Sequence, residues 1–391
     1  MNIAFFCIPA HGHTNPTLAV VRELTARGHT VRYYTTEAFR AKVEAAGAVF
    51  VPFDAEAARP GMTAADGARL GSDLAFSTKL IVDLTLAADD WLSRELTAHR
   101  PDVIVGDSMA FWAKLAAKKH GIPFVSSTTT FAFNRFSAKV IGQNGAGFLQ
   151  FLLAQPRINR QLKRLRAAGY AVKSVFDIIA NDNETETVVY TSPDFQPCAD
   201  TFSEKYHFVG PLLRPAQSSF EKLPGRSLIY ISLGTVNNDA LPFYRACLAA
   251  FGGDPRFQLV LSAGTQADLA AFGPIPENCT VRASVDQMAV LDCADVFLTH
   301  CGMNSASEGL WHGLPLVLYP QTPEQHGVAN RVAALGAGVP LTAPSADGIR
   351  RAVEAVLTDP SYRENAQKLA GSFRRCGGAA EAADAIEHAA N

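Results

Sequence analysis

The stretch LTHCGMNSASEGLWHGLPLVLYPQTPEQ, from Leu298 to Gln325, contains the signals for a strand, a polar turn, a short helix and a second strand. Its apolar start ends at His300, and Gly313 and Pro315 are placed to end the helix. Residues 316–319 predict the second buried strand. A helix that begins at the carboxyl end of a strand directs free N–H groups and its positive dipole end at an anion. The stretch therefore predicts an α/β sheet with an anion site at this helix start.

The polar residues of this turn have the chemistry to hold a nucleotide. Gly302 lets a phosphate approach the backbone closely, and His300 and Ser305 can donate hydrogen bonds to phosphate oxygens. Glu308 lies three residues after Ser305 on the same helix face, where its carboxylate can accept both hydroxyls of a ribose. The residues Ser305–Glu308 also fit a capping box, which is a purely structural device. Capping accounts for only two positions of the longer pattern around it.

The longer pattern is H-x-G-x-N-S-x-x-E, then G-x-P, then P-x-x-x-x-Q. It resembles the nucleotide-sugar signature of UDP-dependent glycosyltransferases with the GT-B fold, and this version is most similar to the bacterial macrolide glycosyltransferase family. The resemblance covers nearly the whole chain. It implies an α/β protein with two Rossmann-like, doubly wound parallel-sheet domains that face a central cleft. It also implies an enzyme, a hexosyltransferase that uses a UDP-sugar or a dTDP-sugar as co-substrate and needs no cofactor.

The resemblance assigns the donor site to particular residues. Glu324 and Gln325 match the family's pair that contacts sugar hydroxyls, and a glutamine in the second place suggests glucose. Gly234 and Thr235 lie in a turn similar to the family's second phosphate-facing turn, although an ordinary glycine turn would have the same sequence. The donor-binding residues that the resemblance implies are Gly234, Thr235, Gln287, His300, Gly302, Asn304, Ser305, Glu308, Glu324 and Gln325.

One position departs from the family pattern. The family usually has an aromatic residue three positions before the glutamine that is Gln287 here, and that residue stacks on uracil. This chain has Ser284 at the position. Base stacking on an aromatic side chain contributes about 1–3 kcal/mol to binding. Its loss leaves the choice between a uridine and a thymidine diphosphate donor open.

Composition limits the possible functions. The 391 residues suffice for two or three domains. The net charge of −2 shows no excess of basic residues of the kind that binds nucleic acid or an anionic membrane. The seven cysteines have no C-x-x-C spacing, which favours reduced thiols in the cytoplasm over disulfides or a zinc site. The apolar residues 3–10 are short and lack the basic leader of a signal peptide, and no apolar run reaches ~18 residues. We therefore expect a cytoplasmic protein without stable membrane insertion.

Strand and helix signals alternate along both halves of the chain, as in parallel βαβ units. The strands predicted in the first half are Ile3–Ile8, Val31–Thr35, Val49–Phe53, Val103–Val105, Phe124–Ser127 and Val188–Thr191. The strands predicted in the second half are Leu228–Ser232, Gln258–Ser262, Thr280–Val285, Val296–Leu298 and Leu316–Tyr319.

The segment 206–226 contains three prolines and little periodicity, and it predicts a linker. It would join an acceptor-binding domain, residues 1–205, to a nucleotide-sugar-binding domain, residues 227–375. The resemblance implies that the C-terminal helix, within residues 376–391, packs back on the first domain.

The first predicted strand runs into His11-Gly12-His13-Thr14-Asn15-Pro16, where a helix begins. Asn15 is suited to cap that helix, with Pro16 in its first turn and Gly28 at its exit. The string G-H-x-x-P resembles the family's general-base motif, which falls on His13, whereas His11 matches a more variable position. In the family an aspartate orients this histidine, and its counterpart is Asp107 at the end of another strand.

Each of these residues also has a plain structural interpretation. His13 alone fits a turn histidine, and Asp107 fits the cap of the helix that follows its strand. In the enzymatic interpretation, His13 takes a proton from an acceptor hydroxyl while Asp107 stabilises the imidazolium. Direct attack by that hydroxyl inverts the anomeric centre. His11 and His13 lack a third ligand and the chain has no D-x-D, so we expect a route without a metal.

The acceptor is expected to be a hydrophobic small molecule, such as a macrolide or a polyphenol. The resemblance places the irregular stretches 55–80 and 131–176 around its pocket, although most of their aromatic residues fit a helix core equally well. Thr129, Phe131 and Phe133 are the candidate acceptor-binding residues. Two other functions share this architecture, a nucleotide-sugar 2-epimerase and a non-catalytic partner protein of a glycosyltransferase. The motif at His13 and the aromatic stretch favour transfer.

Overall fold

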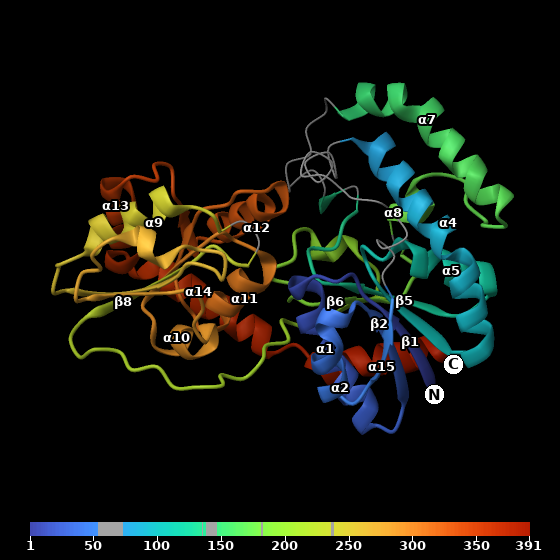
Figure 1. The fold of residues 1–391 in the computed structure, drawn as a ribbon, viewed down its shortest axis with the longest axis horizontal. Helices are drawn as coiled ribbons and strands as arrows, with labels where there is room; N and C mark the ends of the chain where they lie inside the picture. The colour runs from blue at the N-terminus through green and yellow to red at the C-terminus, as the bar shows by residue number, and fades with distance from the viewer. Residues whose placement is uncertain (54–72, 135, 138–146, 181–182, 236–237) are drawn as a thin grey trace. The chain divides into compact units, whose positions relative to one another are not determined.

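The computed structural model describes residues 1–53, 73–134, 136–137, 147–180, 183–235 and 238–391. These residues form two compact units, each built on its own sheet (Figure 1). The first unit comprises Met1–Tyr190, Cys198–Leu212 and Gly377–Asn391, and the second comprises Thr191–Pro197 and Leu213–Cys376.

In the first unit, seven described strands form a parallel sheet in the order β3-β2-β1-β4-β5-β6-β7. Its strands are β1 (Asn2–Phe6), β2 (Thr30–Thr35), β3 (Val49–Pro52), β4 (Val103–Asp107), β5 (Phe124–Thr128), β6 (Thr187–Val189) and β7 (Tyr206–Phe208). Its helices are α1 (His11–Ala26), η1 (Glu37–Phe39), α2 (Arg40–Ala45), α4 (Leu74–His99), α5 (Phe111–His120), α7 (Gly147–Ala167), α8 (Phe176–Ile179), η2 (Ala199–Thr201) and α15 (Gly378–Ala390).

The interior strand β1 is apolar on both sides because helices cover both faces of this sheet. Successive side chains of a strand point to opposite faces. Ile3 and Phe5 pack in the core that α1 and α15 complete, while Ala4 and Phe6 pack in the core that α4 and α5 complete. A continuous apolar strand therefore separates two layers of helices.

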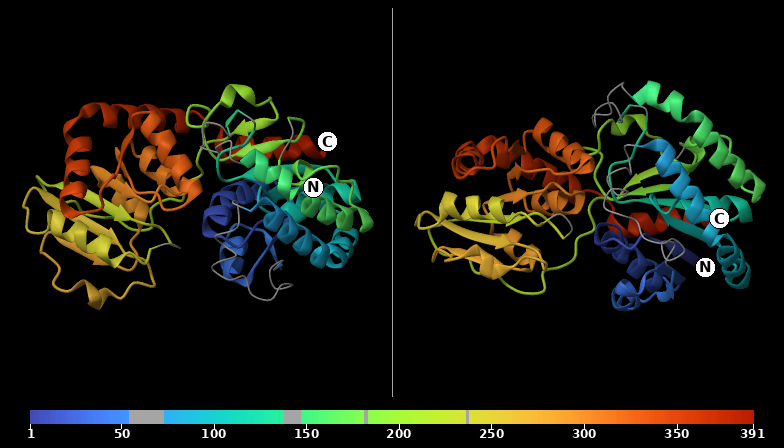
Figure 2. Two further views of the ribbon diagram at one scale, coloured as in Figure 1. Left: turned by 90° about the horizontal axis from the view of Figure 1, so that it is seen from above. Right: turned by 45° about the horizontal axis from the view of Figure 1, so that its top comes forward.

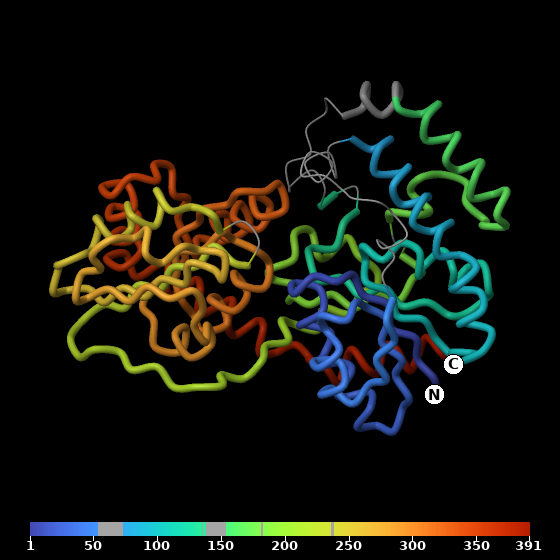
Figure 3. The backbone as a smooth tube through the Cα atoms, viewed as in Figure 1, coloured from blue at the N-terminus to red at the C-terminus, as the bar shows by residue number. Residues whose placement is uncertain are grey.

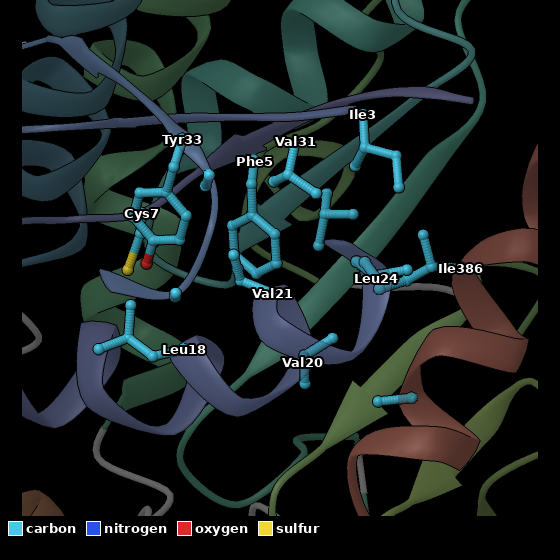
Figure 4. Packing of buried hydrophobic residues seen from close by; sticks show 14 of the residues in the cluster. Ile3, Phe5, Cys7, Leu18, Val20, Val21, Leu24, Val31, Tyr33 and Ile386 are labelled. Carbon is cyan, nitrogen blue, oxygen red and sulfur yellow. The ribbon is translucent and has the colours of Figure 1, made fainter. Parts of the chain in front are cut away.

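The last helix of the chain belongs to the first of these cores. Ile386 of α15 shares a buried cluster with Leu24 of α1 and with residues of the sheet (Figure 4). Arg27 adds hydrogen bonds from Nη1 to Asp384 at 2.6 Å and to Glu387 at 3.0 Å. The chain trace accordingly has both its ends in the first unit (Figure 3).

The second unit is also built on a sheet (Figure 2). Its six described strands are parallel and lie in the order β10-β9-β8-β11-β12-β13. Its strands are β8 (Ser227–Ser232), β9 (Phe257–Ser262), β10 (Cys279–Arg282), β11 (Val296–Thr299), β12 (Leu316–Leu318) and β13 (Gly338–Pro340). Its helices are α9 (Leu241–Phe251), η3 (Leu269–Phe272), α10 (Gln287–Cys293), α11 (Met303–Trp311), α12 (Pro323–Ala334), α13 (Ala346–Thr358) and α14 (Pro360–Arg374).

Both sheets have the same topological switch. In the first sheet β1 lies between β2 and β4, and in the second sheet β8 lies between β9 and β11. The direction in which the chain adds strands therefore reverses between β1 and β4 and again between β8 and β11. In open α/β sheets, ligands bind outside the carboxyl ends of the strands at such a switch. The two switches locate one candidate half-site in each unit.

Three strand predictions differ from the structure. The segment 206–226 was expected to be a linker throughout, but Tyr206–Phe208 forms the edge strand β7. The prediction also missed β13, since it consists of Gly338–Pro340, and glycine and proline are rare in strands except at edges. The strand predicted to reach Val285 ends at Arg282.

The start of the first helix was also misplaced. Asn15 was expected to cap α1, but the helix begins at His11, with the N–H groups of His13 and Thr14 bonded to the carbonyl of Ala10. Asn15 instead accepts a hydrogen bond from Lys42 at 3.1 Å. The helix continues through Pro16, although a proline has no N–H to donate to the carbonyl four residues before it. The exit at Gly28 is as expected, with a left-handed φ of 86°.

Candidate active site

The first half-site lies at the switch point of the first unit. The first turn of α1 carries His13, and the last residue of β4 is Asp107. His13 Nδ1 lies 2.7 Å from Asp107 Oδ2, and the aspartate side chain is fully buried while the histidine is 16% exposed. Asp107 Oδ1 accepts the N–H of Met109 at 2.9 Å. The end of β4 and the turn at Met109 together hold the carboxylate of Asp107 against the imidazole of His13.

Asp107 does not cap the helix after its strand. That helix, α5, starts at Phe111 with Ala110 as its N-cap residue, and no side chain caps it. The carboxylate of Asp107 instead closes a local turn, which is a common use of aspartate two residues before an N–H donor. The capping interpretation of Asp107 is therefore wrong, and its free oxygen pairs with a histidine 94 positions away in sequence.

The pair determines which nitrogen of His13 carries the proton. An ionised carboxylate can only accept, so Nδ1 is the donor to Asp107. This tautomer puts a lone pair on Nε2, which is the state that a general base needs. Thr129, predicted to contact an acceptor, is buried with its Oγ1 3.0 Å from the same Nδ1. Its described contact is thus with the histidine itself.

The neighbouring histidine has a different environment. His11 lies two residues before His13, and its Nδ1 is 3.4 Å from Lys42 Nζ. Burial and the positive charge of Lys42 lower the pKa of His11. In the part of the chain that the structure describes, no group of three or more His, Cys, Asp or Glu side chains is arranged to hold a metal.

The remaining acceptor candidates differ in exposure. Phe131 is buried, whereas Phe133 is 48% exposed. Phe136, three residues further, is also exposed. Much of the two irregular stretches assigned to the acceptor, residues 54–72 and 138–146, lies outside the described residues.

The second half-site lies at the switch point of the second unit, where His300 follows β11. A Cβ atom at Gly234 or at Gly302 would lie only 2.7 Å or 2.6 Å from His300 Nε2. Gly234 also has a left-handed φ of 79°. Both glycines are therefore required for the imidazole to lie against these two turns. Burial lowers the pKa of His300 to about 4, so the ring is neutral at neutral pH and has one N–H to donate.

The turn between His300 and α11 is conformationally strained. Cys301 is fully buried and has a left-handed φ of 64°, which is costly for a residue other than glycine. Such outliers concentrate at ligand sites, where the surrounding structure holds them in place. The strained turn lets Gly302 become the N-cap residue of α11, directly beside the imidazole.

The capping-box interpretation of Ser305 is wrong as well. Gly302 is the N-cap residue of α11 and no side chain caps this helix, so Ser305 is its third residue. A serine inside the first turn lies among backbone N–H groups that need partners outside the helix. Asn304 precedes it in the same turn.

Glu308 and Gln287 form a half-buried pair in the second unit. Gln287 Nε2 donates to the carboxylate of Glu308 and lies 3.5 Å from Ser305 Oγ, while Gln287 Oε1 accepts from Tyr230 OH at 3.0 Å. Burial raises the pKa of Glu308 above its ordinary value. The structure thus brings together three predicted donor residues from α10 and α11 and adds Tyr230 of β8.

Two further predicted donor residues begin α12. Thr322 is its N-cap residue and forms a capping box with Gln325, whose Oε1 accepts the N–H groups of Gln321 at 2.8 Å and Thr322 at 3.2 Å. The amide oxygen of Gln325 is therefore committed to the helix, and its NH₂ group is the part suited to donate to a ligand. Glu324 is exposed in the same turn.

Sequence analysis missed a residue that supports the turn after β8. Asn238 is buried, and its Nδ2 donates to the carbonyl of Gly234 at 2.9 Å. A Cβ at Gly264 would lie 2.0 Å from that Nδ2, so the asparagine fills the space that this glycine leaves. Thr235 follows in the turn and is exposed. A lone asparagine in a loop has no sequence signal that would have identified this role.

No helix in the described part of the chain is long and apolar enough to cross a membrane.

Comparison with known proteins agrees with this architecture. Residues 273–374 match the family model described as UDP-glucoronosyl and UDP-glucosyl transferase. The chain is 33% identical over 395 residues to the NDP-glycosyltransferase YjiC of Bacillus licheniformis, with 99% of this chain and 97% of the relative covered. It is 35% identical over 403 residues to the demethyllactenocin mycarosyltransferase of Streptomyces fradiae, with 99% and 86% covered. A solved glycotransferase of kitacinnamycin has a TM-score of 0.85 and 31% identity, with 99% and 98% covered.

Two parallel-sheet α/β units of this kind define the GT-B class of glycosyltransferases. The chain belongs to the UDP-dependent glycosyltransferases with this fold, in the bacterial macrolide glycosyltransferase family. It is a hexosyltransferase that moves a sugar from a nucleoside diphosphate sugar to an acceptor.

Proposed function

We propose that this enzyme is an inverting glycosyltransferase that moves a hexose, with glucose as the first candidate, to a hydroxyl of a hydrophobic small molecule. The donor is a UDP-sugar or a dTDP-sugar, and the acceptor is a macrolide, a polyphenol or a molecule of similar character. The observation that supports this proposal most directly is the 2.7 Å contact between His13 Nδ1 and the buried carboxylate of Asp107. A histidine held in this tautomer at a switch point has the geometry of a general base.

The proposed transfer step needs only side chains of this enzyme and its two substrates. His13 Nε2 takes the proton of the acceptor hydroxyl as the oxygen forms a bond to the anomeric carbon of the donor. The bond from that carbon to the β-phosphate oxygen breaks, and the nucleoside diphosphate leaves with the electron pair. Attack from the face opposite the leaving group inverts the anomeric centre. Asp107 stabilises the imidazolium that forms, and it keeps its negative charge throughout.

The leaving diphosphate would be held at the start of α11. His300 can donate one N–H from a neutral ring, and the first turn of the helix adds backbone N–H groups and Ser305 Oγ. Glu308 would accept the ribose hydroxyls one turn further, supported by Gln287. Gln325 would donate its amide N–H groups to the sugar beside Glu324. The names of the relatives support a nucleotide-sugar donor, since one is an NDP-glycosyltransferase and another a mycarosyltransferase.

Sugar transfer should persist after exhaustive EDTA treatment. The helix start and His300 supply the donors that stabilise the leaving diphosphate, and the chain has no D-x-D motif. Initial rates with UDP-glucose and a flavonol acceptor, measured before and after chelation, should agree within about twofold, since no metal-dependent charge stabilisation is lost. Activity that disappears with EDTA and returns with Mg²⁺ or Mn²⁺ would show that the metal-free route is wrong.

Replacing Glu308 by alanine should weaken binding of both UDP and dTDP by about 1–3 kcal/mol, the cost of stranding buried hydrogen-bond partners. The matched control is Glu364→Ala, which removes an exposed carboxylate of α14 in the same unit. Isothermal titration and thermal melting should be measured on both variants. Glu308 is not part of a capping box, so a variant that loses stability but keeps its nucleotide affinity would refute the ribose assignment.

A further inference from the structure

Asp286, just before α10, connects a remote segment of the second unit to the candidate donor site. Its Oδ2 accepts the backbone N–H groups of Gln217 at 2.6 Å and Ser218 at 2.9 Å. Its Oδ1 forms an ion pair with Arg214 Nη1 at 3.0 Å. The carboxylate therefore holds residues 214–218 against the segment that leads into Gln287. Neither Asp286 nor Arg214 was assigned a role from the sequence.

Arg214 is linked through Asp286 to the half-buried pair formed by Gln287 and Glu308. Asp286, its ion-pair partner, is the residue next to Gln287, whose amide donates to the carboxylate of Glu308. The positive charge of Arg214 acts on Glu308, where it opposes the upward pKa shift that burial causes. It acts on the hydroxyl of Tyr230 in the same way. The Arg214 side chain is nevertheless 41% exposed, so part of its surface remains accessible to a ligand.

The order of groups along a bound nucleotide indicates which part would meet Arg214. The phosphates would lie at His300 and the start of α11, and the ribose at Glu308, one turn further along that helix. The base then follows on the side of the ribose away from the phosphates. The segment Ser284–Gln287 contacts Glu308 through Gln287, and Arg214 is fixed to this same segment by its ion pair with Asp286.

We propose that Arg214 provides the flat surface on which the base of the donor nucleotide stacks, with Asp286 as the residue that positions it. The inference rests on the proposed nucleotide-sugar site. Ser284, where the family has an aromatic residue, is exposed and too small to cover a base. A guanidinium is planar and stacks on aromatic rings, which a lysine ammonium does not do. The ion pair with Asp286 involves Nη1, at the edge of the group, and 41% of the Arg214 side chain remains exposed.

Stacking on a guanidinium does not depend on the substituent at position 5 of a pyrimidine. Uracil and thymine have π-faces of similar size, and base stacking tolerates changes of base. Arg214 is therefore expected to contribute similarly to the binding of uridine and thymidine diphosphates.

The test compares UMP with ribose 5-phosphate, which differ by the base. The ratio of the dissociation constant of ribose 5-phosphate to that of UMP measures the contribution of the base. Arg214→Ala should lower this ratio by about tenfold, within the range that stacking contributes, and should weaken UDP and dTDP to the same extent. Arg214→Lys should behave like the alanine variant because it keeps the charge and loses the plane. Arg351→Ala, which removes an exposed arginine of α13, is the control and should leave the ratio unchanged.

Asp286→Ala should lower the same ratio by a smaller factor because Arg214 is then no longer oriented. A purely structural role of Asp286 would weaken both ligands alike and leave the ratio constant. If Arg214→Ala weakens ribose 5-phosphate as much as UMP, or if Arg214→Lys restores binding, the guanidinium contacts phosphate and the proposal is wrong. An unchanged ratio in Arg214→Ala, with UDP binding still weakened in Glu308→Ala, also overturns it but leaves the nucleotide site intact. Absence of UDP binding by the unaltered enzyme would instead contradict the proposed function.

Discussion

Alanine in place of His13 should lower the turnover number with UDP-glucose and an alcohol acceptor by about 10²–10⁴-fold, the usual contribution of a general base. The acceptor oxygen becomes a strong nucleophile only when its proton is removed, and the side chain that Asp107 orients for this purpose would be missing. The effect should depend on the acceptor. A phenol, with a pKa near 10, is far more acidic than an aliphatic alcohol and should lose less activity.

His11→Ala is the matched control for this variant. It removes a histidine from the same turn of α1, and His11 faces Lys42 rather than Asp107. Turnover by the control should stay within about threefold of the unaltered enzyme, as for a residue with no part in proton transfer. UDP affinity, measured by titration, should stay the same in both variants. Near-normal transfer by His13→Ala, or equal losses in the two variants, would show that another group is the base.

Asparagine in place of Asp107 should lower turnover by about 10²-fold or more, by the same reasoning that explains the triad aspartate of serine proteases. The substitution keeps the shape of the side chain but can present an N–H to His13 Nδ1. The imidazole would then carry its proton on Nε2, where it cannot accept the proton of a hydroxyl. Steady-state kinetics with saturating donor should therefore show a loss in turnover number, with little change in UDP affinity.

Asp102→Asn supplies the comparison, since Asp102 directly precedes β4 and accepts the N–H of Asn2 at 2.7 Å. It should leave turnover nearly unchanged. The double variant of His13→Ala with Asp107→Asn should be no slower than His13→Ala alone, because the two residues act as one unit. A large fall in melting temperature with unchanged specific activity in Asp107→Asn would assign the residue to stability only.

Local sequence patterns predicted the architecture well where elements are long and periodic. The interior strands β1, β2, β8, β9 and β11 were located to within about two residues, which is the usual uncertainty of an element boundary. The edge strands β7 and β13 were missed because β7 lies in the proline-containing segment that predicts a linker, and β13 contains a glycine and a proline, which are rare in strands except at edges. Asn15 was taken for a cap because it precedes a proline, whereas backbone bonds to Ala10 begin the helix a turn earlier.

Two stretches with the same spacing show the limit of predicting a helix start from residue types. Ser305-Ala-Ser-Glu308 and Thr322-Pro-Glu-Gln325 both have the spacing of a capping box. Only the second one forms, with Thr322 as N-cap residue, while Gly302 takes that position in the first helix. What decides between them is the backbone conformation of the preceding turn, and the buried Cys301 with its left-handed φ moves the helix start to Gly302.

The sequence by itself determined the family, the parallel α/β character and most residues of the candidate site, because these depend on patterns within about thirty adjacent positions. The tertiary structure alone decided which of those residues meet. His13, Asp107 and Thr129 come from separate parts of the chain and converge because β1, β4 and β5 are neighbours in one sheet. Arg214 and Asp286, which form an ion pair, are also far apart in the sequence. Pairing of strands and packing of helices set these contacts, and their energies depend on distances in space that no local pattern of residues encodes.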